Sequence, residues 1–398
     1  MTGDGSELAD GGVGSADGDG TVSPRDDAAS TDDAASLPDE TTSMVLTENG
    51  DLEPQTFAVP DLSAGGALLE VEMTSVCGTD VGIYGGEGHF DTLPLVFGHE
   101  VVGRVVAGDD ETLDRMGVSV GDRVVPEPYV PCYDCRYCQT GNYHMCEAER
   151  AYGVSIPASE PPHLWGGYGE YVYLAPNTKL HAVGEDVPAE AACLGTVVAN
   201  GVRWMLTKGE VDPGDGVVII GPGAQGLASV VVADEAGADP IVLAGLSDDA
   251  DRLALGEDLG ATDTVLVDED GAADRIRSAT GEAGPPVAVV TAPSGAALEL
   301  ALDVVAPLGT VVLPGFPGES VEIDADRLVH DEISLLGGRG QALEVERAMD
   351  IVERRGDDVA SIISHVFPVR EAETAIERQL PGEQFDPDIV HAALRPGE

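Results

Sequence analysis

Short apolar runs and amphipathic stretches alternate through the middle of the chain. The apolar runs are GVVIIG, PIVLAG, TVLVD, VAVVTA and GTVVLPGF, which begin at residues 216, 240, 264, 287 and 309. Between them, apolar residues recur at helical spacing over residues 224–237, 249–259, 271–280 and 295–305. Short apolar strands that alternate with helices are typical of a parallel sheet buried on both faces. The pattern therefore predicts a doubly wound α/β domain at residues 190–336.

The chain on either side of this region has a different pattern. Before it, four segments rich in β-branched residues are separated by Gly, Pro and Asp, and they predict a β-rich region at 42–189: ALLEVEM, VVGRVVAG, GDRVVPEPYV and GEYVYLAP. Residues 188–208 carry a proline and acidic residues at their start and basic residues near their end, which predicts a helix. After residue 336, EVERAMDIVERRG predicts another helix, and further strands are expected up to DIVHAALR.

Residues 1–41 form a segment of a third kind. They contain eleven acidic residues, one arginine (Arg25) and many Gly, Ser and Ala residues. Such a composition buries too little apolar surface to offset the conformational entropy of the chain. We therefore expect a disordered acidic tail at 1–41.

The charge of the whole chain limits its partners and its solvent. Asp and Glu number 73 against 20 Lys and Arg, which gives a formal charge of −53, and only Lys179 and Lys208 are lysines. A protein this acidic repels nucleic acid and anionic membrane surfaces. Acidic residues spread over every segment predict a halophilic source, because high salt screens their mutual repulsion. The chain has no run of eighteen apolar residues and no signal-peptide pattern at its start, so we expect a cytoplasmic protein.

A glycine-rich motif follows the first strand of the predicted α/β domain. GPGAQG places Gly-x-Gly-x-x-Gly between a strand and a helix, which is the arrangement that binds the pyrophosphate of a dinucleotide. The first glycine allows a tight turn, the second a close approach of the backbone to the phosphates, and the third close packing of helix and strand. The predicted contacts with the coenzyme are Gly221, Pro222, Gly223, Ala224, Gln225, Gly226 and Leu227.

The end of the second strand bears on the choice between NAD and NADP. An Asp or Glu in this place normally binds the 2′-hydroxyl of the ribose of NAD. This chain has Gly245 there, followed by Ser247, Asp248, Asp249 and Arg252. The glycine leaves room for a 2′-phosphate and Arg252 could pair with it, whereas the two aspartates oppose it. The sequence therefore predicts NAD or NADP, with a slight preference for NADP.

Four of the six cysteines lie close together in CYDCRYCQTGNYHMC, with the spacing C-x2-C-x2-C-x7-C. In a cytosolic chain of this length, such cysteines are metal ligands or lone thiols rather than a disulfide framework. Four thiolates close a zinc tetrahedron without an open position for a substrate, so the expected zinc is structural. A nucleic-acid-binding zinc module is the alternative, and the charge of the chain opposes it. The predicted ligands are Cys132, Cys135, Cys138 and Cys146.

Several motifs in order resemble the zinc-dependent medium-chain dehydrogenase/reductase family, the alcohol dehydrogenase-like enzymes. They are VCGTD (76–80), GHE (98–100), GDRV (121–124), the four cysteines, GGYGEYVYL (166–174) and GPGAQG. The resemblance covers residues 42–398. It implies a GroES-like catalytic domain, made of 42–189 and 337–398, beside the Rossmann domain at 190–336.

The resemblance also implies roles at a catalytic zinc. Cys77 and His99 are expected as ligands, Glu100 stands near the metal or binds it reversibly, and Asp80 fixes a ligand ring or a nearby arginine. Thr79 is expected to bond the substrate oxygen and to take its proton. The zinc lowers the pKa of an alcohol, whose carbon then passes a hydride to the nicotinamide. With the structural zinc this makes two zinc ions per chain.

Two departures from the family pattern concern this site. Gly195 or Thr196 stands where a third ligand is often found, and Cys193 is interpreted as a buried thiol, so the third ligand is Glu100 or water. Gly82 replaces the histidine that commonly completes the proton relay, and neither Tyr84 nor His89 can be assigned to this role.

We expect a secondary alcohol, a polyol or the matching ketone as substrate, and a homodimer or homotetramer. The aromatic residues Tyr152 and Trp165 either contact the substrate or pack under the cysteine segment. Two alternatives are a zinc-independent quinone or enoyl reductase of the same superfamily and a non-catalytic zinc-binding protein that retains the fold.

Overall fold

The computed structural model describes residues 37–86, 92–382 and 384–397, and in these residues the chain forms three sheets. The expected tail lies outside the described residues except for its last five. Of these, Glu40 and Thr41 belong to the first strand, β1 (Glu40–Leu46), so the expected boundary at residue 41 is wrong by two residues. The reason is local: β1 pairs along its whole length with β2 (Leu52–Ala58), and Thr41 is buried.

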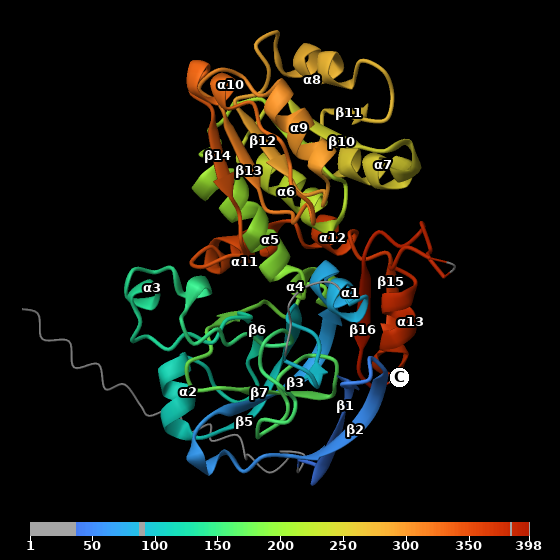
Figure 1. The fold of residues 1–398 in the computed structure, drawn as a ribbon. Coiled ribbons are helices and arrows are strands. Elements are labelled where there is room, and N and C mark those ends of the chain that lie inside the picture. The colour runs from blue at the N-terminus through green and yellow to red at the C-terminus, as the bar shows by residue number, and fades with distance from the viewer. Residues whose placement is uncertain (1–36, 87–91, 383, 398) are drawn as a thin grey trace, which may run out of the picture. The chain divides into compact units, whose positions relative to one another are not determined.

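A six-stranded parallel sheet occupies the predicted α/β region (Figure 1). Its strands lie in the order β11 (Asp263–Leu266), β10 (Ile241–Gly245), β9 (Val217–Ile220), β12 (Val287–Val290), β13 (Thr310–Leu313) and β14 (Ser334–Gly337). Numbered along the chain this order is 3-2-1-4-5-6, which is the doubly wound arrangement of dinucleotide-binding domains. The predicted fold class is therefore confirmed. The sixth strand, β14, was not predicted.

Helices cover both faces of this sheet. Successive side chains of a strand point to opposite faces, and here the side chains on both faces are apolar. Val217 and Ile219 of β9 face one core, whereas Val218 and Ile220 face the other, and all four are buried. The first core includes side chains of α5 (Gly195–Val202), α6 (Ala224–Glu235), α7 (Ala250–Leu259), α11 (Val345–Arg354) and α12 (Gly356–Ala360). The second core is closed by α8 (Ala272–Thr280) and α9 (Gly295–Val304).

The seven-stranded sheet combines the β-rich region with the end of the chain. Antiparallel pairing links five strands in the order β8 (Leu180–Ala182), β6 (Arg123–Pro126), β5 (Val101–Gly108), β3 (Ala67–Ser75) and β16 (Ala392–Arg395). A sixth strand, β7 (Tyr171–Leu174), also pairs with β3. The seventh, β15 (His365–Pro368), lies parallel to β16. The last strand of the chain therefore lies directly beside β3. The small third sheet joins β1 and β2 to β4 (Leu95–Val96).

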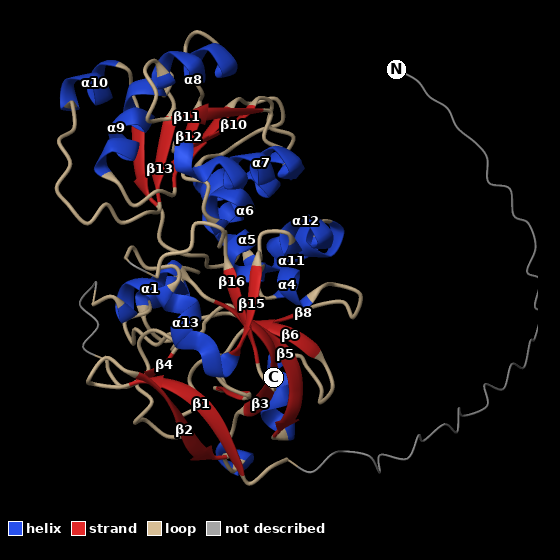
Figure 2. Cartoon of the chain, turned by 90° about the vertical axis from the view of Figure 1, so that its right-hand side faces the viewer, coloured by secondary structure: helices blue, strands red, loops and turns tan. Residues whose placement is uncertain are grey.

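The remaining helices are short; helices are coloured blue in Figure 2. They are α1 (Gly78–Tyr84), α2 (Asp110–Met116), α3 (Arg136–Gln139), α4 (Ala189–Ala192), α10 (Ala325–His330) and α13 (Ala372–Glu377). The helix predicted at 188–208 is in fact three pieces: α4, α5 and a π-helical turn at Arg203–Lys208. Five short 3-10 or π turns are recorded among the described residues, including Tyr143–Met145 and Ser247–Asp249.

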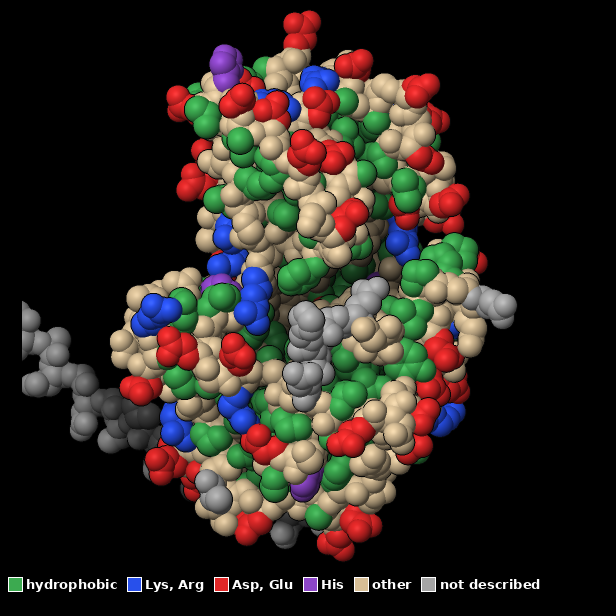
Figure 3. Space-filling view, in the orientation of Figure 1, with side chains coloured by type: hydrophobic (Ala, Val, Ile, Leu, Met, Phe, Trp, Pro, Cys, Tyr) green, Lys and Arg blue, Asp and Glu red, His purple; other side chains and the backbone are tan. Residues whose placement is uncertain are grey.

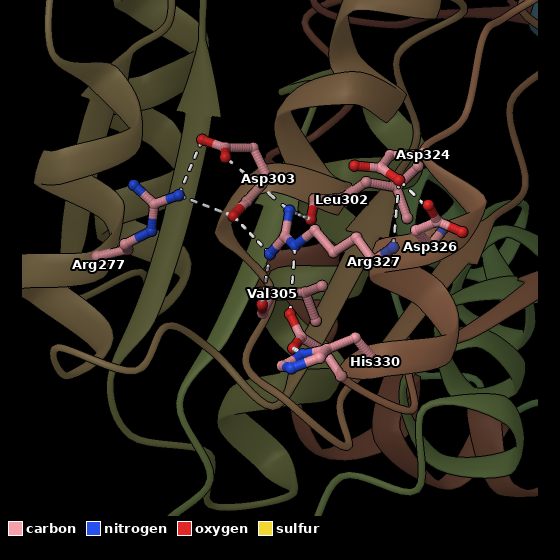
Figure 4. Close-up of polar contacts among 9 residues, drawn as sticks. Arg277, Leu302, Asp303, Val305, Asp324, Asp326, Arg327 and His330 are labelled. Carbon is pink, nitrogen blue, oxygen red and sulfur yellow. Dashed lines mark hydrogen bonds and ion pairs between the residues drawn. The ribbon is translucent and has the colours of Figure 1, made fainter.

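Figure 4 shows an arginine that closes the end of a helix. Arg327 of α10 donates to the main-chain oxygens of Leu302, Asp303 and Val305 at the end of α9. Arg277 of α8 lies 2.8 Å from the carboxylate of Asp303. Carbonyls at the end of a helix have no partner within the helix, and a guanidinium satisfies several of them together. Arg327 thus fastens α10 to α9.

Candidate metal and coenzyme sites

Cys77, His99 and Glu100 come together because two neighbouring strands bring them to the same place. Cys77 follows β3 and caps the start of α1, whereas His99 and Glu100 immediately precede β5. The two strands are antiparallel, and Thr74 of β3 pairs with Val101 of β5. The Cys77 sulfur, one His99 ring nitrogen and one Glu100 carboxylate oxygen all lie within 4.8 Å of one another. A thiolate, an imidazole and a carboxylate at this spacing form a donor set that suits zinc.

Asp80 stands directly behind this donor set and is fully buried. One carboxylate oxygen, Oδ2, accepts hydrogen bonds from the Cys77 N–H at 3.1 Å and from the Tyr168 hydroxyl at 3.2 Å. The other, Oδ1, lies 3.4 Å from Nδ1 of His99. With Nδ1 turned to Asp80, the other ring nitrogen of His99 is left to face a metal. A carboxylate that orients a ligand histidine in this way is a recurrent feature of zinc sites.

Glu100 has two partners that sequence reasoning missed. Ser75 donates a short hydrogen bond to its Oε2, and Nε2 of His391 lies 3.6 Å from the same oxygen. Burial on its own raises the pKa of Glu100, but hydrogen bonding and the positive charges of His391 and His99 outweigh it and bring the pKa to about 2. Glu100 is therefore a carboxylate at neutral pH. His391 precedes β16 and reaches the site because β16 pairs with β3.

The charges of the donor set fit a bound cation. Burial and the charge of Glu100 raise the pKa of the Cys77 thiol. Burial alone lowers the pKa of His99, but the charges of Cys77 and Asp80 raise it well above its usual value. The buried Glu100 carboxylate thus draws positive charge to the site. A divalent cation held there would compensate it and would favour the thiolate form of Cys77.

The structure places Cys193 outside this donor set. Cys193 is fully buried, burial raises the pKa of its thiol well above the usual value, and its sulfur donates to the Glu190 main-chain oxygen at 3.4 Å. A side-chain carbon on Gly195 would come 2.5 Å from the Met349 sulfur, so the close packing of α5 on α11 accounts for the glycine. Thr196 is buried and its hydroxyl has no hydrogen-bond partner among the described residues. Glu100 is the third ligand that this geometry favours.

The proposed proton acceptor, Thr79, is exposed, and its hydroxyl oxygen lies 3.7 Å from the Cys77 sulfur. Tyr84 is engaged elsewhere, since its hydroxyl donates to Glu373 at 2.9 Å, and burial raises its pKa. His89 lies outside the described residues. Tyr152 and Trp165 are buried packing residues: Tyr152 shares a hydrogen bond of 2.6 Å with Thr178. Both rings pack in the core of the β-rich region.

The four cysteines of residues 132–146 form a second donor set. Their sulfurs all lie within 4.8 Å of one another, and those of Cys132 and Cys138 are 3.9 Å apart. Two sulfurs of a zinc tetrahedron are separated by about 3.8 Å, given zinc–sulfur bonds of about 2.3 Å. Hydrogen bonds from the N–H groups of Cys138 and Glu147 lower the pKa of Cys135 to about 6, which favours its thiolate. The set fits zinc and leaves no free position for a substrate.

The cysteine segment contacts the nucleotide-binding part through Arg203, which also forms a buried ion pair with Glu344. Arg203, at the end of α5, lies 2.8 Å from Glu344 Oε1 and 3.3 Å from His144 Nε2. His144 belongs to the turn between the third and fourth cysteines. Burial lowers the pKa of His144 to about 4, so the neutral ring accepts a hydrogen bond from the arginine. Basic side chains are few in this chain, and on the face shown in Figure 3 acidic side chains are more frequent than basic ones.

The glycine-rich motif has the geometry of a dinucleotide site. Gly221 has a φ of +115°, which a residue with a side chain rarely adopts. A side-chain carbon on Gly226 would lie 1.9 Å from the Gly221 oxygen, whereas one on Gly223 would meet no atom within 4 Å. Gly223 caps the start of α6, which comprises Ala224, Gln225, Gly226 and Leu227 at its first turn. The open side of Gly223 and the N–H groups of this turn offer a cradle for phosphates.

The residues after β10 do not have the environment that the sequence suggested. A side-chain carbon on Gly245 would come 2.7 Å from the ring of Pro222, so proline packing, rather than space for a phosphate, explains the glycine. Ser247 donates from its N–H at 3.0 Å and from its hydroxyl at 2.6 Å to Asp268. Arg252 donates to the Ile389 oxygen at 2.8 Å and lies 3.7 Å from Asp249. Arg252 therefore has partners within the protein, and its pairing with a 2′-phosphate stays a prediction.

Two family models match most of the described chain. One is the alcohol dehydrogenase GroES-like domain, over residues 63–185, and the other is the zinc-binding dehydrogenase domain, over residues 224–354. A Mycobacterium tuberculosis protein named “Probable alcohol dehydrogenase adh” is 35% identical over 363 residues, which are 89% of this chain and 98% of that protein. Erythritol/L-threitol dehydrogenase of Mycolicibacterium smegmatis is 29% identical over 359 residues, covering 87% of this chain and 96% of that enzyme.

Solved structures share the fold. A Sinorhizobium meliloti protein described as a zinc-binding dehydrogenase and solved with bound NADP superposes with a TM-score of 0.79 at 25% identity. The match covers 90% of this chain and 99% of that one. Within the described residues, no helix is both long and apolar enough to cross a membrane.

Proposed function

Because the chain belongs to the zinc-type, medium-chain alcohol dehydrogenase-like family, we propose that it transfers a hydride between a secondary alcohol or polyol and NAD(P). The products are the matching ketone or aldehyde and the reduced coenzyme. The named activities of similar proteins, an alcohol dehydrogenase and an erythritol/L-threitol dehydrogenase, support this substrate class. The NADP-bound structure supports a nicotinamide coenzyme.

One observation carries the proposal: the described residues contain a partly buried Cys-His-Glu donor set with a buried supporting aspartate. Cys77, His99 and Glu100 would hold the catalytic zinc. A zinc ion held there would supply Lewis-acid activation of an alcohol oxygen, and a bound nicotinamide would take up the hydride. A donor set of this kind has no purpose in a zinc-independent reductase. Cys132, Cys135, Cys138 and Cys146 would hold a second, structural zinc.

The residues of the chain prepare the site in three ways. Asp80 keeps the His99 ring in one orientation through Nδ1 and is itself held by Tyr168. Glu100 stays ionised because Ser75 and His391 stabilise its charge, so it can bind the metal or release it. Thr79 accepts the proton of the alcohol by a hydrogen bond and, because it is exposed, passes a proton directly to water. This route accounts for the absence of the relay histidine at Gly82.

The test is a turnover assay with a panel of secondary alcohols and polyols, each offered with NAD and with NADP at molar salt. We expect reduced coenzyme to form with at least one alcohol, and turnover to stop on zinc removal and to return on zinc addition. Absence of turnover throughout the panel in the zinc-loaded protein would favour a non-catalytic binding protein. The homodimer or homotetramer, the cytoplasmic location and the halophilic source stay predictions.

A further inference from the structure

Asp268 lies just beyond the end of β11, the strand next to β10. Strands β10 and β11 are parallel neighbours, and Gly245 pairs with Leu266. Ser247 and Asp268 each lie two residues beyond this pair, so both emerge at the carboxyl edge of the sheet, where a doubly wound fold binds its ligand. Ser247 holds both oxygens of Asp268, one through its N–H and one through its hydroxyl. The carboxylate is thus fixed beside the place where the family has its ribose-binding acid.

A carboxylate at the usual position is sterically blocked in this chain. Any side chain on Gly245 would collide with the Pro222 ring of the glycine-rich loop. Asp268 offers the same chemistry from the adjacent strand. An ionised carboxylate accepts about four hydrogen bonds, and Ser247 uses two of these sites. Two remain for the hydroxyl groups of a ribose. The hydrogen bonds from Ser247 lower the pKa of Asp268, which is therefore ionised at neutral pH.

Among the described residues near this corner, two arginines are already engaged by protein groups. Arg252 is held by the Ile389 oxygen and by Asp249. Arg275 donates to the oxygens of Leu266 and Asp270 and lies 3.4 Å from Glu269. Both nearby arginines thus pair with carboxylates and main-chain oxygens. A phosphate placed here would face negative charge without a cation to bind it.

We propose that Asp268, held by Ser247, binds the adenosine ribose of NAD and excludes the 2′-phosphate of NADP, which makes the protein specific for NAD. This reverses the slight preference for NADP that Gly245 and Arg252 suggested in the sequence. The inference rests on the proposed function only in requiring a nicotinamide dinucleotide at the glycine-rich motif. It assigns the specificity of that site to a residue outside the motif and outside the second strand.

Binding of NADH and NADPH, followed by coenzyme fluorescence, tests the inference without requiring turnover. The salt concentration is the lowest at which circular dichroism shows the folded protein, because molar salt shortens the screening length to about 3 Å and weakens charge repulsion. We expect the unaltered protein to bind NADH at least about tenfold more tightly than NADPH, as one carboxylate facing a phosphate dianion implies. We expect Asp268→Asn to lower the affinity for NADH and to raise that for NADPH.

Two further variants separate charge from position. Ser247→Ala removes the hydroxyl that bonds the Asp268 carboxylate but keeps the charge of Asp268. It should therefore lower the affinity for NADH and leave the affinity for NADPH low. Asp263→Asn is the matched control, since Asp263 is an exposed acid at the opposite end of the same strand, five residues away. It should change neither affinity.

Tighter binding of NADPH by the unaltered protein would overturn the inference, and so would equal effects of Asp268→Asn and Asp263→Asn. If Asp268→Asn does not fold, the ratio in the unaltered protein and in Ser247→Ala decides. Turnover of alcohols with NADP in preference to NAD would refute the inference while the proposed function stands. NADH-specific binding without turnover of any alcohol would refute the proposed function while the inference about Asp268 stands.

Discussion

Replacement of Asp80 by Asn should weaken zinc binding at the Cys77 site without emptying the four-cysteine site. The two side chains have the same shape, so the change isolates the charge and the hydrogen-bonding pattern. In the native protein, Oδ2 accepts from the Cys77 N–H and the Tyr168 hydroxyl, and Oδ1 faces His99 Nδ1. In Asn, the amide oxygen can keep the first two donors only if the amide N–H₂ group turns to His99. The amide N–H₂ group would then face the Nδ1–H group of His99, donor against donor. This favours the tautomer of His99 that carries its proton on Nε2, the nitrogen needed for the metal.

The expected loss follows from the distance between the groups. Full unit charges 3.4 Å apart interact by about 5 kcal/mol at an effective dielectric constant of 20 and by about 1 kcal/mol in water. A ligand histidine carries less than a full charge, so the higher value is an upper bound. Loss of such a supporting carboxylate typically costs about 10–100-fold in metal affinity. We therefore expect about 2 kcal/mol, or about 30-fold in the dissociation constant.

Zinc competition with a chromophoric chelator measures this loss, and the four-cysteine site of the same protein is the internal reference. Tyr168→Phe removes one hydrogen bond to Asp80 but leaves its charge, so it should cost less than Asp80→Asn. Asp134→Asn changes an exposed acid of the cysteine segment and should have no effect on the Cys77 site. Unchanged zinc affinity of Asp80→Asn at the Cys77 site would refute the orienting role of Asp80.

Three other outcomes follow from the packing. Arg203→Met should lower the free energy of unfolding by about 3–5 kcal/mol, because it leaves the Glu344 carboxylate buried without its partner. Denaturant unfolding followed by tryptophan fluorescence measures this loss. The control Arg104→Met should leave the free energy of unfolding almost unchanged, because its partner Glu185 is exposed. Gly226→Ala should abolish NADH binding in a fluorescence titration, since its new carbon would overlap the Gly221 oxygen, whereas Gly223→Ala should fold normally by circular dichroism but bind NADH less tightly. Cys138→Ser should remove one zinc per chain by elemental analysis and lower the melting temperature while the Cys77 site stays loaded; a normal zinc content or melting temperature would contradict the structural role.

The sequence predicted the buried part of the fold better than its edges. Central parallel strands are apolar on both faces, and the runs at β9, β10, β12 and β13 stand out for that reason. The edge strand β14 is half exposed and was missed. The predicted helix at 188–208 is interrupted at Cys193 and Leu194, and the adjacent Gly195 alone does not predict a break, because a single glycine is tolerated within a helix. Such breaks depend on tertiary packing, here of α5 against α6 and α11.

The site divides in the same way between local and distant residues. Cys77, His99 and Glu100 were found because each belongs to a short motif at a strand end. His391 was not, because nothing around it in DIVHAALR marks a site, and only the pairing of β16 with β3 brings it to Glu100. At Gly245 the missing side chain was interpreted as free space, and only the structure shows that the Pro222 ring fills it.

The central claim is that Cys77, His99 and Glu100 hold the zinc on which alcohol oxidation depends. The most direct measurement is zinc content together with coenzyme reduction in Cys77→Ala and in the unaltered protein. We predict two zinc ions per chain and turnover in the unaltered protein, and one zinc ion, no turnover and an unchanged circular dichroism spectrum in Cys77→Ala. Full activity in the variant, or two zinc ions still bound to it, would contradict the claim.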